Sequence, residues 1–310
     1  MARLRRVVPY GSPGFTRNSA GTFVGAGKAD RARAEALVIP PAWTEVWVAK
    51  HERAHIQAVG VDAAGRRQYL YHPDWRASHD RAKFRRAREL AAALPAARRK
   101  VTRDLRLPGL PRERVLAAAF RVLDTAAVRA GNEEYTATNG SRGLATLQRK
   151  HARLDGESIR LTFPAKSGKK AVITVQDHDL AAFVRDLPPA KPGARLLAWG
   201  DEATPLSTAE VNAYVKQRTG GDFTAKDFRT LKAGVVSATE LAHIGTADTA
   251  TARGRAMRSA ADAAAGVLGN TRSVALKSYI DPEIFERYEA GKVIARGAAP
   301  EAALLRLLGD

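Results

Sequence analysis

The feature that most constrains the fold is a change in the hydrophobic period along the chain. Within residues 43–71, apolar residues recur with a period close to two, and turn-forming residues interrupt them, most clearly at 62–65. Farther along, Leu116, Phe120 and Leu123 follow the three-to-four spacing of a helix with one buried face. The sequence therefore predicts an α+β fold, with a small, mostly antiparallel-β N-terminal domain followed by a larger, mostly α-helical domain.

Local signals place the remaining elements. A helix is predicted over 80–94, because Pro95 lacks an amide N–H and should end it. Residues 1–27 are expected to be loop. Two strand-like runs, 159–163 and 171–175, flank a basic loop, which indicates a β-hairpin within the helical domain. Further helices are predicted over 28–37, 113–127, 142–149, 178–186, 207–218, 226–241, 252–267, 282–295 and 301–308.

The charge balance points to a polyanionic partner. The chain has 51 Lys and Arg against 32 Asp and Glu, a formal net charge of +19. Proteins this basic usually bind nucleic acid, because released counterions drive association. Residues 76–103 alone hold ten basic and two acidic residues, which favours contact with DNA there. We place the domain boundary in this stretch, giving domains 1–88 and 89–310.

Other partners and compartments are disfavoured. No stretch approaches 18 uncharged apolar residues, so we expect no membrane partner. There are no cysteines, which excludes disulfides, thiolate zinc sites and cysteine nucleophiles. The first residues are basic without an apolar run, unlike a secretory signal. We expect a cytoplasmic, nucleoid-associated protein.

One motif is misleading. His51 and His55 match the zinc-protease pattern HExxH, which requires both histidines on one helical face. Strand-like residues flank them on both sides, and in extended chain the two rings would lie roughly 13 Å apart. We therefore predict a turn between strands and no metal ligands.

Five polar residues, far apart in sequence, fit one chemistry. Metal-free attack on a phosphodiester needs a nucleophile that becomes an oxyanion, and nearby cations lower the pKa of a tyrosine. Guanidinium groups match the charge and shape of the non-bridging oxygens, and a lysine can protonate the leaving oxygen. An amide can donate one more hydrogen bond, and most of the acceleration would be electrostatic. The candidates are Arg129, Lys166, Arg229, Asn270 and Tyr279.

Six segments then stand in a distinctive order: IPPAWTEVW at 39–47, GRRQYLYH at 65–72, VRAGNEEY at 128–135, FPAKSGK at 163–169, FTAKDFRT at 223–230 and LGNTRSVALKSYIDP at 268–282. In this order they resemble the type IB DNA topoisomerases, in the compact form found in bacteria and poxviruses. The resemblance covers residues 39–285, most of the chain. It implies two domains that close around duplex DNA as a clamp, with the catalytic fold shared by tyrosine recombinases in the second.

The resemblance also implies roles. Tyr279 would bond to a DNA 3′ phosphate and release a 5′ hydroxyl, while Arg129 and Arg229 hold the scissile phosphate. Lys166 would be the general acid. Asn270 stands where many family members have histidine, and an amide donates but does not titrate. A further proton relay is expected at Lys226.

Partners and mechanism follow from the same resemblance. One strand would be cut, the free end would rotate, and the 5′ hydroxyl would attack back, relaxing supercoils of both signs. The partner would be double-stranded DNA, the protein a monomer, and no cofactor, ATP or metal would be needed. DNA contacts are expected from Gln68, Tyr69, Tyr71 and Tyr135. For the two strand tyrosines, 69 and 71, core packing is the alternative, and alternation gives both the same side.

Two rival functions remain. A tyrosine recombinase shares the tyrosine, the lysine hairpin and the paired arginines, but usually has histidine three residues before the second arginine, where this chain has Lys226. Its N-terminal domain is also usually helical. A noncatalytic architectural DNA-binding protein would account for the charge, but a decayed site should have lost at least one of the five residues.

Overall fold

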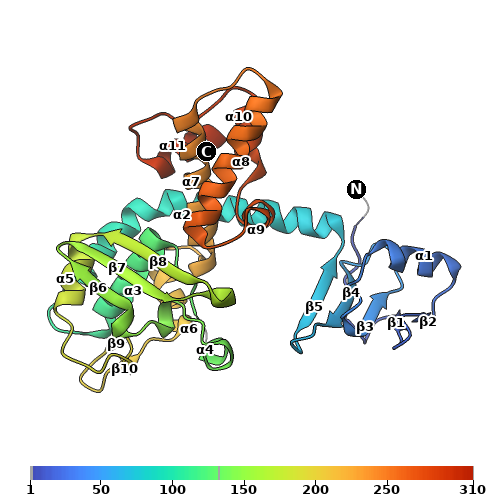
Figure 1. The fold of residues 1–310 in the computed structure, drawn as a ribbon, viewed down its shortest axis with the longest axis horizontal. Coiled ribbons are helices and arrows are strands. Elements are labelled where there is room, and N and C mark those ends of the chain that lie inside the picture. The colour runs from blue at the N-terminus through green and yellow to red at the C-terminus, as the bar shows by residue number, and fades with distance from the viewer. Residues whose placement is uncertain (1–2, 132, 310) are drawn as a thin grey trace. The chain divides into compact units, whose positions relative to one another are not determined.

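The chain forms two compact units, and the boundary between them lies within one long helix. The computed structural model describes residues 3–131 and 133–309 (Figure 1). Contacts within the chain divide it into two units, Met1–Ala82 and Lys83–Asp310. The division falls inside helix α2 (Pro73–Leu105). Each unit is described by itself.

The first unit is built on a five-stranded antiparallel sheet with strand order β2-β1-β3-β4-β5, so the predicted antiparallel-β domain is confirmed (Figure 1). Its core packs Phe15, Val46, Val48 and Ala58 on one face. The expectation of loop over 1–27 was wrong for two short strands, whose glycine-rich surroundings hide the alternation. The elements are β1 (Gly14–Arg17), β2 (Phe23–Val24), α1 (Lys28–Ala36), β3 (Thr44–Ala49), β4 (Ile56–Val61) and β5 (Arg67–Tyr71).

Helix α2 corrects the predicted helix over 80–94. It continues through Pro95 for another ten residues, to Leu105. Leu94, Ala97 and Val101 are buried on both sides of the proline, with 0–1% of each exposed. Proline in a helix interior costs about 3 kcal/mol. Apolar burial of about 2 kcal/mol for each large side chain offsets this cost, so tertiary packing overrides the local signal.

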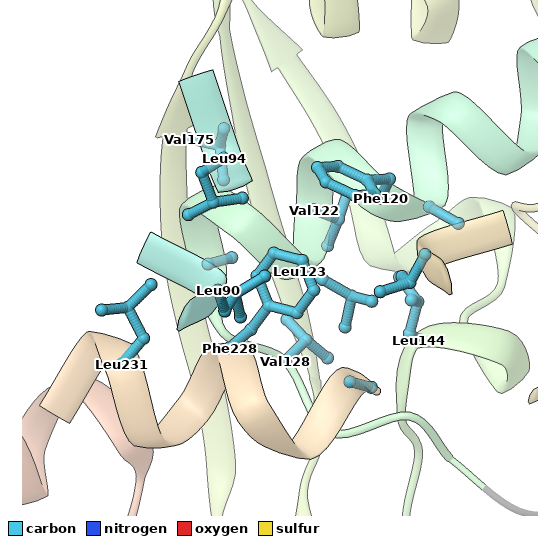
Figure 2. Close-up of a cluster of buried hydrophobic side chains, with 14 of the residues drawn as sticks. Leu90, Leu94, Phe120, Val122, Leu123, Val128, Leu144, Val175, Phe228 and Leu231 are labelled. Atoms are coloured by element: carbon cyan, nitrogen blue, oxygen red, sulfur yellow. The ribbon is translucent and has the colours of Figure 1, made fainter. Parts of the chain in front are cut away.

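The second unit is mostly helical, as predicted, and contains a three-stranded antiparallel sheet of order β6-β7-β8 and a two-stranded one formed by β9 and β10 (Figure 1). Figure 2 shows the core, in which Leu90, Phe120, Leu123 and Phe228 pack together from α2, α3 and α7. The elements are α3 (Arg112–Ala126), α4 (Glu133–Asn139), β6 (Ala152–Asp155), β7 (Ser158–Pro164), β8 (Lys170–Gln176), α5 (His178–Arg185), β9 (Ala198–Trp199), β10 (Thr204–Pro205), α6 (Thr208–Thr219), α7 (Ala225–Ile244), α8 (Ala250–Leu268), α9 (Arg272–Ser278), α10 (Pro282–Glu289) and α11 (Pro300–Leu308).

Two helix predictions in this unit need correction, and the seven-residue helix α4 was not predicted. The segment 142–149 is not an α-helix, because the N–H groups of Leu144 and Ala145 bond to the carbonyls of Arg129 and Ala130 instead of to their own preceding turn. The helix predicted over 282–295 ends at 289, where the chain turns through Gly291 with a φ of 76°. Helix α9 was not predicted, because seven residues show too little periodicity.

Candidate active site

Arg229 is held at the start of α7 by an N-terminal capping box. The backbone N–H and the hydroxyl of Thr224 donate to Asp227 Oδ2, across 2.8 Å and 2.9 Å. Arg86 of α2 pairs with the same carboxylate across 2.7 Å. The first turn of the helix is therefore fixed from two sides, which fixes the direction of the arginine.

The guanidinium of Arg229 is buried, with 5% of the residue exposed. Its Nη1 donates to the carbonyl of Ala127 across 2.7 Å, and its Nη2 to that of Leu268 across 2.9 Å. Ala127 ends α3 in the left-handed conformation, with a φ of 48°, and this turns its carbonyl toward the arginine. Two helix ends thus position one cation.

No carboxylate neutralises this cation. Within the described residues Arg229 forms no ion pair, and its Nε is buried without a hydrogen-bond partner. Burial, and then the charge of Arg129, lower the pKa of Arg229 below its ordinary value of 12.5. A buried, unpaired charge is costly, and buried charges are normally paired. The arrangement therefore indicates a site for an anionic ligand.

The loop after α3 carries Arg129. Its carbonyl accepts a hydrogen bond from the N–H of Leu144 across 2.7 Å. Gly131 and Gly143 pass each other so closely that a Cβ on Gly143 would lie 2.5 Å from the Cα of Gly131 and 2.7 Å from the carbonyl oxygen of Arg129. Gly131 also has a φ of 87°, which other residues rarely adopt. This backbone contact sets the position of the arginine.

Asn270 meets Arg129 from the end of α8. Arg129 Nη2 donates to Asn270 Oδ1 across 2.6 Å. Gly269 ends α8 with a φ of 62°, and the N–H of Asn270 bonds back to the carbonyl of Ala265, so the backbone of Asn270 also serves the helix end. Its Nδ2 is buried and has no hydrogen-bond partner within the described residues.

Tyr279 lies at the end of α9, half-buried against the alanine-rich cluster that includes Ala127, Ala261 and Ala275. The Arg229 guanidinium carbon lies 5.2 Å from the centre of its ring. Burial alone would raise the pKa of Tyr279, but hydrogen bonding and charge from Arg229, together with those from Arg129, outweigh it and hold the pKa below 10. A lowered pKa favours the phenolate, which is the form of a tyrosine that can act as a nucleophile.

Lys166 stands in a short turn between β7 and β8 and is exposed. A cavity of about 560 Å³ lies between this hairpin and the end of α8, and its lining includes Arg129, Lys166 and Arg229. The structure thus groups the two arginines with Asn270 and Tyr279 by direct contact, and joins Lys166 to them across the cavity.

Lys226 is less closely tied to this group. It is exposed in the first turn of α7, three residues before Arg229. Within the described residues its side chain makes no hydrogen bond or ion pair with the other candidates. A part in proton transfer therefore stays a prediction for this residue.

The candidate DNA-contacting residues of the first unit separate into two faces of β5. Tyr69 and Tyr71 are 39% and 38% exposed, and their rings stack with centroids 6.0 Å apart. These two tyrosine side chains are therefore not packed in the core. Gln68 shares the opposite face with Leu70, and its amide donates to Asp62 Oδ2 across 2.9 Å. The side chain of Tyr135, in α4, lies outside the described residues.

The HExxH segment forms the predicted turn between β3 and β4. His55 Nδ1 accepts from the N–H of Val7 across 3.2 Å, and His51 Nδ1 from the N–H of Arg53 across 3.1 Å. Among the described residues, no group of three or more His, Cys, Asp or Glu is arranged to hold a metal ion. Nor does any helix in the described ranges have the length and apolar character needed to cross a bilayer.

Part of the positive charge of residues 76–103 is neutralised by carboxylates of the same chain. Within the described residues, four arginines of this segment pair with carboxylates, so the lopsided composition overstates the charge available to DNA. The pairs are Arg85–Glu89, Arg86–Asp227, Arg88–Asp281 and Arg98–Asp124.

Sequence reasoning missed the groups that hold the site together. The carbonyls of Ala127 and Leu268 are invisible to motif analysis, because any residue supplies them. The glycine at 143 left a weak signal, since it stands alone in a segment that otherwise favours helix. Only its contact with Gly131 shows why a side chain is not tolerated there.

Comparisons with known proteins identify the family of the chain. Residues 72–295 match the family described as eukaryotic DNA topoisomerase I, catalytic core, and residues 19–62 match the bacterial DNA topoisomerase IB, N-terminal domain. The DNA topoisomerase 1B of Acanthamoeba polyphaga mimivirus is 30% identical over 211 residues, which cover 66% of this chain and 62% of that protein. The match thus spans less than two thirds of the length of this curated relative.

Proposed function

Because the chain belongs to the type IB DNA topoisomerase family, we propose that it relaxes supercoiled duplex DNA by transient cleavage of one strand. The observation that carries the proposal is the buried, unpaired guanidinium of Arg229. It lies against the ring of Tyr279, beside a second arginine that forms no ion pair within the described residues. A phosphodiester supplies the missing anion, and the activated phenol supplies the nucleophile.

The proposed cleavage step uses the groups of this site. The phenol oxygen of Tyr279 loses its proton to solvent and attacks the phosphorus, forming a P–O bond to the 3′ phosphate. The bond from phosphorus to the 5′ oxygen breaks, and Lys166 gives that oxygen a proton. Arg129 and Arg229 stabilise the charge that develops on the non-bridging oxygens.

Asn270 completes the phosphate site. Its Oδ1 is occupied by Arg129, so the amide nitrogen is left as a donor. We propose that this nitrogen binds a non-bridging oxygen, in place of a histidine. In the reverse step the 5′ hydroxyl attacks phosphorus and the bond to Tyr279 breaks. Bond energy is conserved, so no ATP is required, and the arginines supply the electrostatic stabilisation that a metal cofactor would otherwise give.

DNA contacts outside the site are proposed for Tyr69, Tyr71, Gln68 and Tyr135, with Tyr69 and Tyr71 offering an exposed stacked pair. Exposed hydrogen-bonding side chains can meet base edges or backbone in the major groove, and a net positive charge suits a polyanionic partner. We propose that the protein acts as a monomer, at the nucleoid in the cytoplasm.

Incubation with negatively supercoiled plasmid in EDTA, without ATP, tests the proposal. We expect relaxation, and a covalent protein–DNA adduct after addition of detergent. The matched control is Tyr279→Phe, which should bind duplex DNA and give neither product. A noncatalytic DNA-binding protein would leave the plasmid supercoiled, and relaxation by the Tyr279→Phe variant would remove the proposed nucleophile.

A further inference from the structure

The chain segment just after Tyr279 is tied to α2 by an ion-pair network. Arg88 Nη2 lies 2.7 Å from Asp281 Oδ2 and 2.5 Å from Glu283 Oε2. Arg287 Nη2 pairs with the other oxygen of Glu283 across 2.7 Å. Arg88 and Asp281 are mostly buried, with 20% and 12% of their side chains exposed. One guanidinium therefore holds two carboxylates of the junction between α9 and α10.

Only one residue, Ile280, separates Asp281 of this anchor from the proposed nucleophile, Tyr279. Tyr279 is the C-cap residue that follows α9, and its N–H bonds to the carbonyl of Ala275. Ile280 is 1% exposed and bonds to the same carbonyl. Asp281 then caps α10 by accepting from the N–H of Glu283 across 3.1 Å, and Pro282 fixes the first turn. The backbone of the tyrosine is thus held on one side by α9 and on the other by Asp281.

The anchor determines where the phenol lies. Rotation of the backbone at the end of α9 moves the whole tyrosine ring, which must stay beside the Arg229 guanidinium, 5.2 Å from it. Without Arg88, the two carboxylates that share its Nη2 would repel each other at the first turn of α10. A shift of the α9–α10 junction that relieves this repulsion would carry Tyr279 with it.

We propose that Arg88 is a positioning residue for Tyr279, acting through Asp281, and this rests on the function proposed above. The two carboxylates that Arg88 holds, Asp281 and Glu283, are not among the groups proposed to bind the phosphate. The effect of Arg88 should therefore appear in the rate of adduct formation and not in the affinity for DNA.

A second ion pair on the same helix provides a matched control. Arg98 also holds two carboxylates, Asp124 across 2.8 Å and Glu301 across 2.6 Å. Its partners lie on α3 and α11, away from the α9–α10 junction. Arg98→Met should therefore lower stability as Arg88→Met does, without moving the tyrosine.

The experiment measures three quantities for each full-length variant, namely the melting temperature, the affinity for a labelled duplex, and the single-turnover rate of adduct formation. We expect Arg88→Met to slow adduct formation by about 10- to 100-fold, as a displacement near 1 Å does, with duplex affinity within about twofold of wild type. Arg98→Met should lose a similar amount of melting temperature and keep the wild-type rate. Replacing the bridging 5′ oxygen by sulfur should not rescue Arg88→Met, because the defect is in the nucleophile.

If Arg88→Met fails to fold, Asp281→Asn tests the proposed positioning role instead. Asparagine caps a helix as well as aspartate does but removes the charge that Arg88 binds. Slow adduct formation in this variant supports the proposal, and a wild-type rate overturns it. A rate for Arg88→Met equal to that of Arg98→Met also overturns it. If the wild-type protein forms no adduct, the proposed function fails instead.

Discussion

Arg129 donates a hydrogen bond to Asn270 Oδ1 across 2.6 Å, although 141 residues separate them along the chain. Because arginine has no acceptor, this contact assigns the two ends of the amide. The oxygen faces Arg129, and the nitrogen is the buried donor without a partner in the described part of the chain. Arginine and asparagine thus act as one unit in the proposed phosphate site.

Asn270→Asp should abolish this donor and add a negative charge. We expect duplex cleavage to slow by about 100-fold or more, since loss of one oxyanion donor alone costs about 10²–10³ in rate. Asn270→His should retain more activity, because a ring nitrogen can still donate. Single-turnover adduct formation measures both. Equal rates in the two variants would mean that the amide nitrogen does not reach the phosphate.

The pKa of Tyr279 should lie below its ordinary value of 10, and that of Tyr214 above it. Burial and a hydrogen bond to Asp104 raise the pKa of Tyr214, so this residue serves as an internal contrast. For Tyr279 the folded protein favours the phenolate. The stabilisation is therefore present above the unfolded pKa, near 10, and is lost as pH falls through the lower folded pKa.

A pH titration of labelled tyrosines by NMR checks this, with Tyr279→Phe assigning the signal. Arg129→Ala should move the titration of Tyr279 to higher pH, because it removes one of the two cations that lower its pKa. Arg98→Met, which alters an ion pair elsewhere, should leave it unchanged. If Tyr279 titrates above 10 in the wild-type protein, burial dominates and the arginines do not activate it.

Gly143→Ala should displace the Arg129 loop. The added Cβ would meet backbone atoms of Gly131 at 2.5 Å, and backbone cannot rotate away as a side chain can. We expect a loss of about 1–3 kcal/mol in the free energy of unfolding, the usual cost of overpacking, together with slower adduct formation. Gly193→Ala is the control, since its Cβ would meet only Gln148 at 3.8 Å, an ordinary contact. Wild-type stability and rate in Gly143→Ala would show that the loop can relax.

Lys166→Ala should slow cleavage by about 10²–10⁴-fold, the range for loss of a general acid. A substrate with sulfur as the bridging 5′ atom should restore most of the rate, because a thiolate leaves without protonation. Lys169→Ala, which changes the neighbouring exposed lysine of the same hairpin, should cleave at the wild-type rate. Failure of sulfur to rescue Lys166→Ala would move the general acid elsewhere, with Lys226 the next candidate.

Local signals were reliable where packing agreed with them. The helices over residues 178–185, 208–219 and 250–268 begin and end close to their predicted limits, with Asp177, Ser207 and Thr249 as N-caps. Local signals failed where a contact between residues far apart in the sequence determined the secondary structure. Burial on both sides of Pro95 carries α2 through a residue that normally ends a helix, and the carbonyls of another loop take the N–H groups that a helix over 142–149 would need.

The sequence by itself determined which reactive side chains the chain carries and in what order. Two arginines, a lysine, an amide and a tyrosine in their local contexts, with a net charge of +19, were enough to infer phosphodiester chemistry on DNA. Which charges are available for that chemistry was decided only by tertiary structure. Arg88 and Arg229 look alike in a sequence, yet one is neutralised by two carboxylates and the other is buried without any within the described residues. The difference arises because pairing depends on which side chains the fold brings within a few ångströms, and no spacing along the chain encodes that distance.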